Sequence, residues 1–213
     1  MIKLSHLKPF AGGCKRNCYF HPDDENKVIK IIPPDKSPKV LHSQKLWIRR
    51  LFHSPESLDA NRTEREKFEK LEKRLGNLKQ KIPYLVEYFG EVETDLGEGL
   101  VFAAIRNFDR TVSESMENAS DSGGYDKAEL LKALDVMNQS RGDATIYNDV
   151  GENNVVVQIL ESDHEAGPEY KFWVVDGIQC RALIPITEYS ESYARIRKAK
   201  KIWQMKKFIL KNF

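Results

Sequence analysis

Cysteine is scarce in this sequence of 213 residues. The three cysteines, Cys14, Cys18 and Cys180, form an odd set and lack the paired CxxC spacing of a structural zinc site. We therefore expect reduced structural thiols and no zinc centre.

Long apolar runs are also missing. The start of the chain, Met1 to His6, has no apolar core of the kind found in a secretion signal, and no stretch approaches the roughly 18 apolar residues of a spanning helix. We expect a cytoplasmic protein without a transmembrane segment.

The net charge is only +2, because the chain has 34 Lys and Arg and 32 Asp and Glu. Such a balance does not by itself indicate nucleic-acid binding. The exception is the segment from Tyr193 to Phe213, which carries eight Lys and Arg and no acid. We predict a helix here. It either packs its apolar side on the core and solvates its charges, or it binds an anionic partner such as a membrane or nucleic acid.

The chain has 40% apolar and 10% aromatic residues, which is sufficient for a packed core. Strand patterns at residues 4–10, 27–32 and 82–105 predict a strand-rich N-terminal lobe, residues 1–105, with one long helix. The polar stretch from Ser113 to Gly124 is predicted to be a flexible crossing between lobes. We expect residues 106–213 to form a mainly helical C-terminal lobe.

Two charged residues stand in apolar patterns of the N-terminal lobe. Lys30 lies inside the strand-like run Lys27 to Ile32, and Glu64 begins the helical stripe that Phe68, Leu71 and Leu75 continue. Lys30 could simply face solvent, and Glu64 could simply cap its own helix after an N-cap at Asn61. A carboxylate on a core-facing stripe requires a cation, however, and pairing with Lys30 would explain both placements.

Two further segments are candidates for nucleotide contacts. Glycine leaves backbone N–H groups uncovered, so the turn at Gly12 and Gly13 could approach phosphate closely, although it is not a full G-x-G-x-x-G motif. An adenine ring needs backbone donors and acceptors in an apolar slot, which the end of the strand at Ala103, Ala104 and Ile105 could provide.

An acidic residue and an asparagine five positions later open the C-terminal pattern. Asp149 and Asn154 precede a β-branched run, and a second apolar strand ends in Asp176-Gly177. Kinase-like phosphotransferases place a base and two metal ligands in this way. The alternative is an ordinary β-hairpin with turns at Asn153-Asn154 and at Asp176-Gly177.

The order of these parts resembles the protein-kinase-like superfamily, and several short motifs resemble one small bacterial family within it, the YrbL family of PhoP regulatory network proteins. The motifs are HPDD near the start, N-x-x-E at Asn61 and Glu64, L-G-x-G-L-V-F from Leu96, N-D-V-x-x-N-N from Asn148, and V-D-G from Val175. The resemblance implies an α+β, two-lobed protein-kinase-like fold with a reduced C-terminal lobe.

The resemblance also implies ATP and Mg²⁺ as nucleotide and metal. Lys30, held by Glu64, would contact the α- and β-phosphates, Asn154 and Asp176 would bind Mg²⁺, and Asp149 would act as base toward an unknown phosphate acceptor.

Departures from the protein-kinase pattern favour an alternative function. Tyr147-Asn148 stand where protein kinases have His-Arg, Asp176-Gly177 lacks the intervening phenylalanine, and no activation segment follows. The alternative is a pseudokinase-type nucleotide-binding module that acts in a bacterial envelope or metal-stress response.

Overall fold

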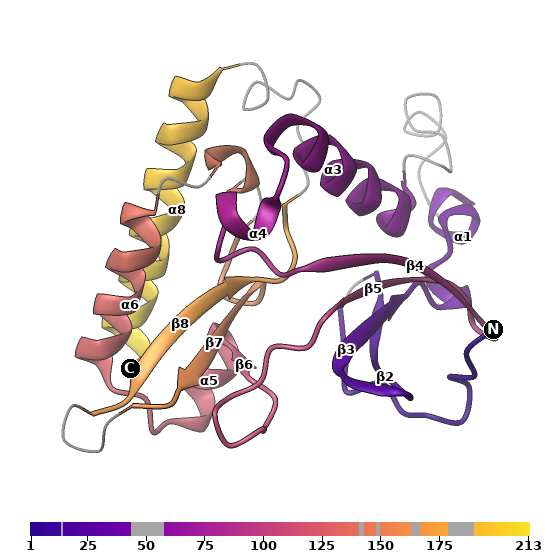
Figure 1. The fold of residues 1–213 in the computed structure, drawn as a ribbon, viewed down its shortest axis with the longest axis horizontal. Coiled ribbons are helices and arrows are strands. Elements are labelled where there is room, and N and C mark those ends of the chain that lie inside the picture. The colour runs from indigo at the N-terminus through magenta and orange to yellow at the C-terminus, as the bar shows by residue number, and fades with distance from the viewer. Residues whose placement is uncertain (14, 44–57, 141–142, 148–149, 163–166, 179–189) are drawn as a thin grey trace. The chain divides into compact units, whose positions relative to one another are not determined.

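The computed structural model describes residues 1–13, 15–43, 58–140, 143–147, 150–162, 167–178 and 190–213 (Figure 1). Within them the chain is a mixed α+β protein with two sheets and six α-helices, which confirms the predicted α+β class. Two compact units are present. Unit 1 comprises Met1–Arg74 and Glu87–Ala104, and unit 2 comprises Leu75–Val86 and Ile105–Phe213. Among the described helices, none combines the length and the apolar character needed to cross a bilayer.

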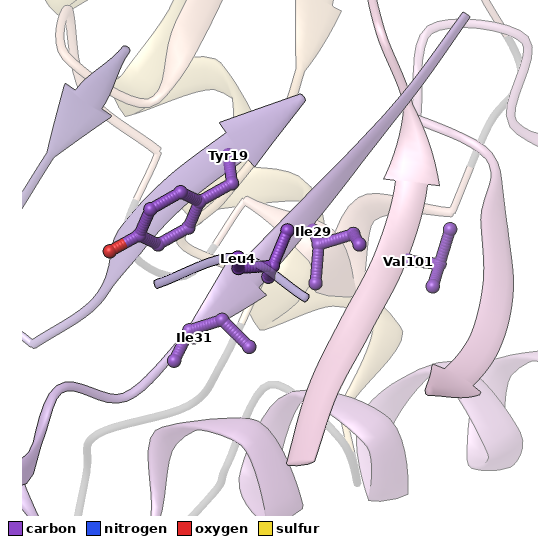
Figure 2. Packing of buried hydrophobic residues seen from close by; sticks show 5 residues of the cluster. All are labelled: Leu4, Tyr19, Ile29, Ile31 and Val101. Atoms are coloured by element: carbon purple, nitrogen blue, oxygen red, sulfur yellow. The ribbon is translucent and has the colours of Figure 1, made fainter. Parts of the chain in front are cut away.

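Unit 1 contains an antiparallel sheet in the order β1-β2-β3-β5-β4. Its strands are β1 (Ala11–Gly12), β2 (Asn17–His21), β3 (Asp24–Ile31), β4 (Tyr88–Thr94) and β5 (Gly97–Ala103). Because successive side chains of a strand point to opposite faces, β3 divides its residues between two environments. On one face Ile29 and Ile31 join a buried cluster with Leu4, Tyr19 and Val101 (Figure 2).

The other face of the sheet carries Val28 and Lys30 of β3 with their cross-strand partners Phe102 and Leu100. The long helix of unit 1, α3 (Ala60–Leu75), contributes to this face through Phe68, whose ring lies 5.6 Å from that of Phe102. The helix ends at Leu75, because Gly76 adopts a left-handed conformation (φ 73°) that terminates helices. Before it come η1 (Pro34–Lys36) and α1 (Pro38–Ser43). The sheet and α3 thus enclose Lys30 in the core of unit 1.

The predicted strand at residues 4–10 is wrong. The N–H of Leu4 donates to Asp95 Oδ1 at 2.7 Å, and the hydroxyl of Ser5 donates to Asp95 Oδ2 at 2.6 Å. These donors therefore bind the Asp95 carboxylate in a turn and do not pair with a neighbouring strand. β3 pairs with β5 on one side and with β2 on the other, and β2 is not among the predicted strands.

Unit 2 contains a smaller antiparallel sheet in the order β6-β7-β8, with β6 at Glu114–Ser115, β7 at Val155–Leu160 and β8 at Glu169–Val174. Its helices are α4 (Leu78–Lys81), α5 (Met116–Ser122), α6 (Lys127–Gln139) and α8 (Glu191–Asn212), together with η3 (Ala144–Ile146). The buried side chains of β8 alternate at Tyr170, Phe172 and Val174, and α6 packs on this strand. Figure 1 shows α8 running alongside α6, with which it is in contact.

The predicted flexible crossing at Ser113 to Gly124 is also wrong. These residues form β6 (Glu114–Ser115) and α5, and Met116 and Ala119 of α5 are completely buried. The hydroxyl of Ser115 accepts a hydrogen bond from the N–H of Asn118 at 3.1 Å and so caps the helix. A polar sequence with two buried residues is sufficient for order once the cap is present.

Tyr125 is expected to make the free energy of unfolding of unit 2 vary with pH in the alkaline range. Burial, with the nearby charge of Glu114, raises the pKa of Tyr125 from 10.0 to about 12. Between these values the folded chain binds more protons than the unfolded chain, so the free energy of unfolding should fall as pH rises from 10 to 12. Urea unfolding of wild type and Tyr125→Phe across this range measures the effect. The substitution should make the pH dependence shallower, and an unchanged slope would contradict the assignment.

Candidate functional site

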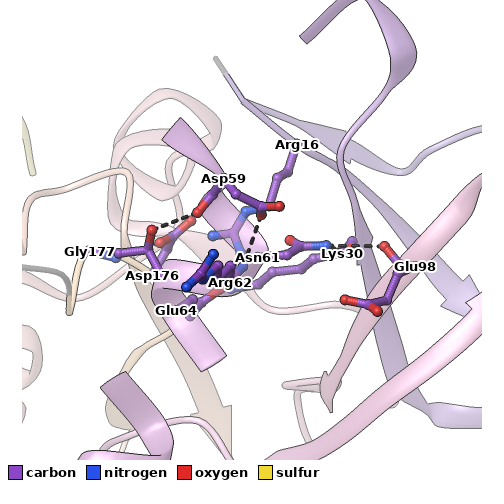
Figure 3. A network of polar contacts seen from close by, with 10 residues as sticks. Arg16, Lys30, Asp59, Asn61, Arg62, Glu64, Glu98, Asp176 and Gly177 are labelled. Carbon is purple, nitrogen blue, oxygen red and sulfur yellow. Dashed lines mark hydrogen bonds and ion pairs between the residues drawn. The ribbon is translucent and has the colours of Figure 1, made fainter. Parts of the chain in front are cut away.

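A buried ion pair joins Lys30 and Glu64 in unit 1 (Figure 3). Lys30 Nζ lies 3.1 Å from Glu64 Oε1, and the two residues are only 6% and 1% exposed. Both placements follow from local structure, because β3 directs Lys30 to the same side of the sheet as Phe102 and the α3 stripe directs Glu64 inward. The solvent-facing alternative for Lys30 and the capping alternative for Glu64 are therefore wrong, whereas their catalytic assignment stays a prediction.

Arg16 is a second cation on Glu64 that sequence reasoning missed. Its Nη1 donates to Glu64 Oε2, and the residue is buried, with 6% exposure. It stands 48 residues away in the chain, in a polar segment without periodic pattern, so only the pairing of β1, β2 and β3 brings it to α3. Lys30 Nζ also lies 4.1 Å from the centroid of the Phe102 ring, a cation–π contact. Glu64 is therefore shared by two buried cations, Arg16 and Lys30.

Asn61 ties the strands to the helix instead of capping it. The predicted N-cap is wrong, because Asn61 is the second residue of α3, and Asp59 Oδ1 accepts from the N–H of Arg62 at 2.9 Å. The amide of Asn61 donates to the carbonyl oxygens of Lys30 at 3.4 Å and Glu98 at 3.2 Å (Figure 3). Asn61 therefore fixes α3 against β3 and β5, and thereby fixes Glu64 near Lys30.

The glycine turn adjoins Arg16. Gly12 lies in β1, and the N–H of Gly13 donates to the carbonyl of Arg16 at 2.9 Å. A Cβ on Gly13 would meet no atom within 4 Å, so the space above this residue is open. The structure thus connects the predicted phosphate-contacting turn to the Lys30–Glu64 pair through Arg16.

The predicted adenine-binding segment is already engaged within unit 1. The N–H of Ala103 donates to the carbonyl of Glu87 at 3.0 Å, and the N–H of Ala104 donates to that of Asn26 at 2.8 Å. Neither donor is therefore available to an adenine ring. Ile105 belongs to unit 2, where its carbonyl accepts from the N–H of Ser113 at 3.0 Å.

The two predicted metal ligands lie at the same end of the β7–β8 pair in unit 2. Asn154 directly precedes β7, Asp176 follows β8 by two residues, and the N–H of Val175 donates to the carbonyl of Asn154 at 3.0 Å. Asp176 Oδ1 accepts from the N–H of Gly177 at 2.6 Å. This antiparallel pairing is expected both for an ordinary β-hairpin and for a metal site at Asn154 and Asp176. The backbone therefore does not distinguish the two interpretations.

The remaining part of the predicted loop is only partly described. Tyr147, which follows η3, is completely buried, and its ring centroid lies 6.0 Å from that of Tyr84. Burial raises the pKa of the Tyr147 hydroxyl. The predicted base, Asp149, lies outside the described residues.

The chemistry of Asn154 and Asp176 fits Mg²⁺. Amide and carboxylate oxygens are hard ligands, and Mg²⁺ usually binds through one or two protein groups, waters and substrate phosphates instead of a closed protein cage. Among the described residues, no cluster of three His, Cys, Asp or Glu suited to a metal occurs.

A separate groove of about 510 Å³ lies in unit 2 between α6 and β8, and none of the predicted site residues lines it. Its wall is mainly apolar and includes Tyr84, Met137, Leu160 and Phe172.

Known proteins match this chain over nearly its whole length. The family model described as "PhoP regulatory network protein YrbL" matches residues 2–210. The protein named "Uncharacterized protein YrbL" from Escherichia coli (strain K12) is 28% identical over 98% of this chain and 87% of its own length. The protein of the same name from Shigella flexneri gives the same identity and coverage. The chain therefore belongs to the YrbL family of PhoP regulatory network proteins.

Proposed function

We propose that this protein is an ATP- and Mg²⁺-dependent phosphotransferase with a two-lobed protein-kinase-like fold and a reduced C-terminal lobe. The observation that carries the proposal is the buried ion pair between Lys30 and Glu64. A buried ion pair is a weak source of stability, because the cost of desolvation can exceed the Coulomb attraction. Its presence is better explained by a need to hold a cation in a fixed position for an anionic substrate.

In the proposed reaction, Lys30 binds the α- and β-phosphates, and Glu64 keeps its ammonium group in place. Asp149 accepts the proton of an acceptor hydroxyl whose oxygen attacks the γ-phosphorus, while the bond to the bridging oxygen of ADP breaks. Asn154 and Asp176 would hold Mg²⁺, which supplies charge neutralisation when bound. Most of the catalysis is positioning and electrostatic stabilisation. A phosphotransferase that uses ATP in this way would act in the cytoplasm.

Thermal unfolding with and without ATP and Mg²⁺ tests the nucleotide site. A ligand at about 100 times its Kd stabilises the folded state by about 2.7 kcal/mol, so wild type should unfold at a higher temperature. Asp176→Asn should remove the Mg²⁺-dependent part of the shift, and Lys30→Met should remove most of the shift caused by ATP.

The matched control is Lys27→Met, which removes a lysine of the same strand whose side chain is 35% exposed and pairs with Asp24. This variant should retain the wild-type shift. If neither ATP nor ATP with Mg²⁺ raises the unfolding temperature of the wild type, the proposed nucleotide site does not exist.

A second candidate is a pseudokinase-type nucleotide-binding module that regulates a bacterial envelope or metal-stress response. The observation that favours it is the complete burial of Tyr147, which stands where protein kinases have the histidine of their catalytic loop. The family description, which refers to a regulatory network, agrees with such a role. Both candidates predict the ATP-dependent shift, and only phosphate transfer from ATP distinguishes them.

A further inference from the structure

The outward face of α8 presents large apolar side chains to solvent. Ile196, Trp203 and Leu210 recur at intervals of seven residues and are 65%, 55% and 52% exposed. With 3.6 residues per turn this spacing puts all three on one side of the helix. The opposite side is buried through Ile202, Met205 and Ile209 and belongs to the core of unit 2. The apolar stripe therefore has no role in the packing of α8 on α6 and η3, the elements it contacts (Figure 1).

Positive charge surrounds this stripe. Lys200 and Lys207 fall between the three apolar residues on the same face, and no Asp or Glu occurs after Glu191. Lys207 Nζ lies 4.2 Å from the centroid of the Trp203 ring, so charge and aromatic surface are adjacent. Lys198, by contrast, lies on the packed side and donates to the carbonyl oxygens of Asn138 and Ser140, both at 2.9 Å. The basic and apolar face from Ile196 to Leu210 extends about 21 Å along this helix.

We propose that this outward face, comprising Ile196, Lys200, Trp203, Lys207 and Leu210, binds the surface of an anionic phospholipid bilayer with the helix parallel to the membrane. Isoleucine, tryptophan and leucine side chains enter the boundary between headgroups and acyl chains, where the indole ring is favoured. Lysines extend their alkyl stems along apolar surface and reach lipid phosphates with their ammonium groups. The inference is independent of any phosphotransfer by the rest of the chain.

Other partners fit this face less well. A coiled-coil partner requires two apolar positions in each heptad, but here only one is apolar and the intervening position is lysine. A second copy of the chain would oppose two basic faces and repel. Nucleic acid would pair with the lysines but would leave the exposed isoleucine and leucine without a role. Anionic lipid can bind both the lysines and the apolar side chains of this face.

Co-sedimentation of the full chain with vesicles tests the proposal. Wild type should bind vesicles containing phosphatidylglycerol at least about tenfold more tightly than vesicles of phosphatidylcholine alone, and Lys200→Glu with Lys207→Glu should weaken that binding by at least about tenfold. Trp203→Phe keeps an aromatic anchor, so it should retain binding but lose the blue shift of tryptophan emission that wild type shows on vesicles.

The matched control is Lys70→Glu with Lys73→Glu, which makes the same charge change at exposed positions of α3. This variant should bind vesicles as wild type does. Equal loss in the control, equal binding to both vesicle types, or tighter binding to duplex DNA than to anionic vesicles at the same salt concentration would overturn the proposal.

Discussion

Replacing Glu64 with glutamine should lower the free energy of unfolding by about 3–5 kcal/mol, the usual result of removing one partner from a buried ionic group. Glu64 is 1% exposed and is the shared acceptor of Arg16 and Lys30. Glutamine has nearly the same shape but no charge, so Arg16 and Lys30 would lose the carboxylate charge that they share. Chemical denaturation of the full chain measures the loss of stability. Hydrogen exchange of the β3 and α3 amides provides the local readout for unit 1.

Glu66 provides the matched control for this substitution. It lies two residues further along α3 and pairs with Arg62 at 2.9 Å, but both side chains are well exposed to solvent. Exposed pairs contribute about 0.2–1 kcal/mol, so Glu66→Gln should have a small effect. Similar losses in the two variants would mean that burial does not govern the Glu64 group.

A fully apolar replacement separates stability from function. If Arg16, Lys30 and Glu64 are changed together to Met, Met and Leu, the carboxylate and both cations that pair with it are removed, and the stability should recover much of the loss caused by Glu64→Gln. The ATP-dependent shift should not recover, because the cation proposed to bind phosphate is gone. Recovery of both properties would remove the main support for the proposed phosphate contact.

The sequence predicted the Lys30–Glu64 pair because each residue violates a local pattern. Alternation places Lys30 in a strand, and helical periodicity places Glu64 on an apolar stripe, so both anomalies are visible within about one element. Arg16 violates no such pattern. Its role depends on the turn at Gly12-Gly13 and on β2, a strand that the sequence patterns did not predict.

The errors in unit 2 have a related cause. Ser113 to Gly124 contains four serines and two glycines, a composition that usually indicates a loop, yet Met116 and Ala119 provide a buried side for α5. The strand ends at Asn154 and Asp176 were easier to predict, because β-branched and aromatic runs define β7 and β8. Their meeting at one end of the sheet follows from the Val155–Val174 register.

Phe102→Ala should destabilise unit 1 by about 3–5 kcal/mol, as expected for truncation of a buried phenylalanine. Phe102 is 1% exposed, and its ring lies 5.6 Å from that of Phe68 and 5.2 Å from that of Tyr88. The cavity would open beneath Lys30, whose ammonium group would also lose its aromatic partner. Denaturant unfolding, with hydrogen exchange of β3 and β5 amides as the local readout, measures the effect.

Two further variants determine what the ring contributes. Phe108 is 62% exposed, so Phe108→Ala should change stability by no more than about 0.5 kcal/mol. Phe102→Leu keeps a large apolar side chain, although a smaller one, and removes the cation–π contact with Lys30, which can contribute about 2 kcal/mol in a desolvated site. If Phe102→Leu has wild-type stability and a wild-type ATP-dependent shift, the aromatic face does not position Lys30. If it retains most of its stability but loses the shift, Phe102 is a positioning residue for the lysine as well as part of the core.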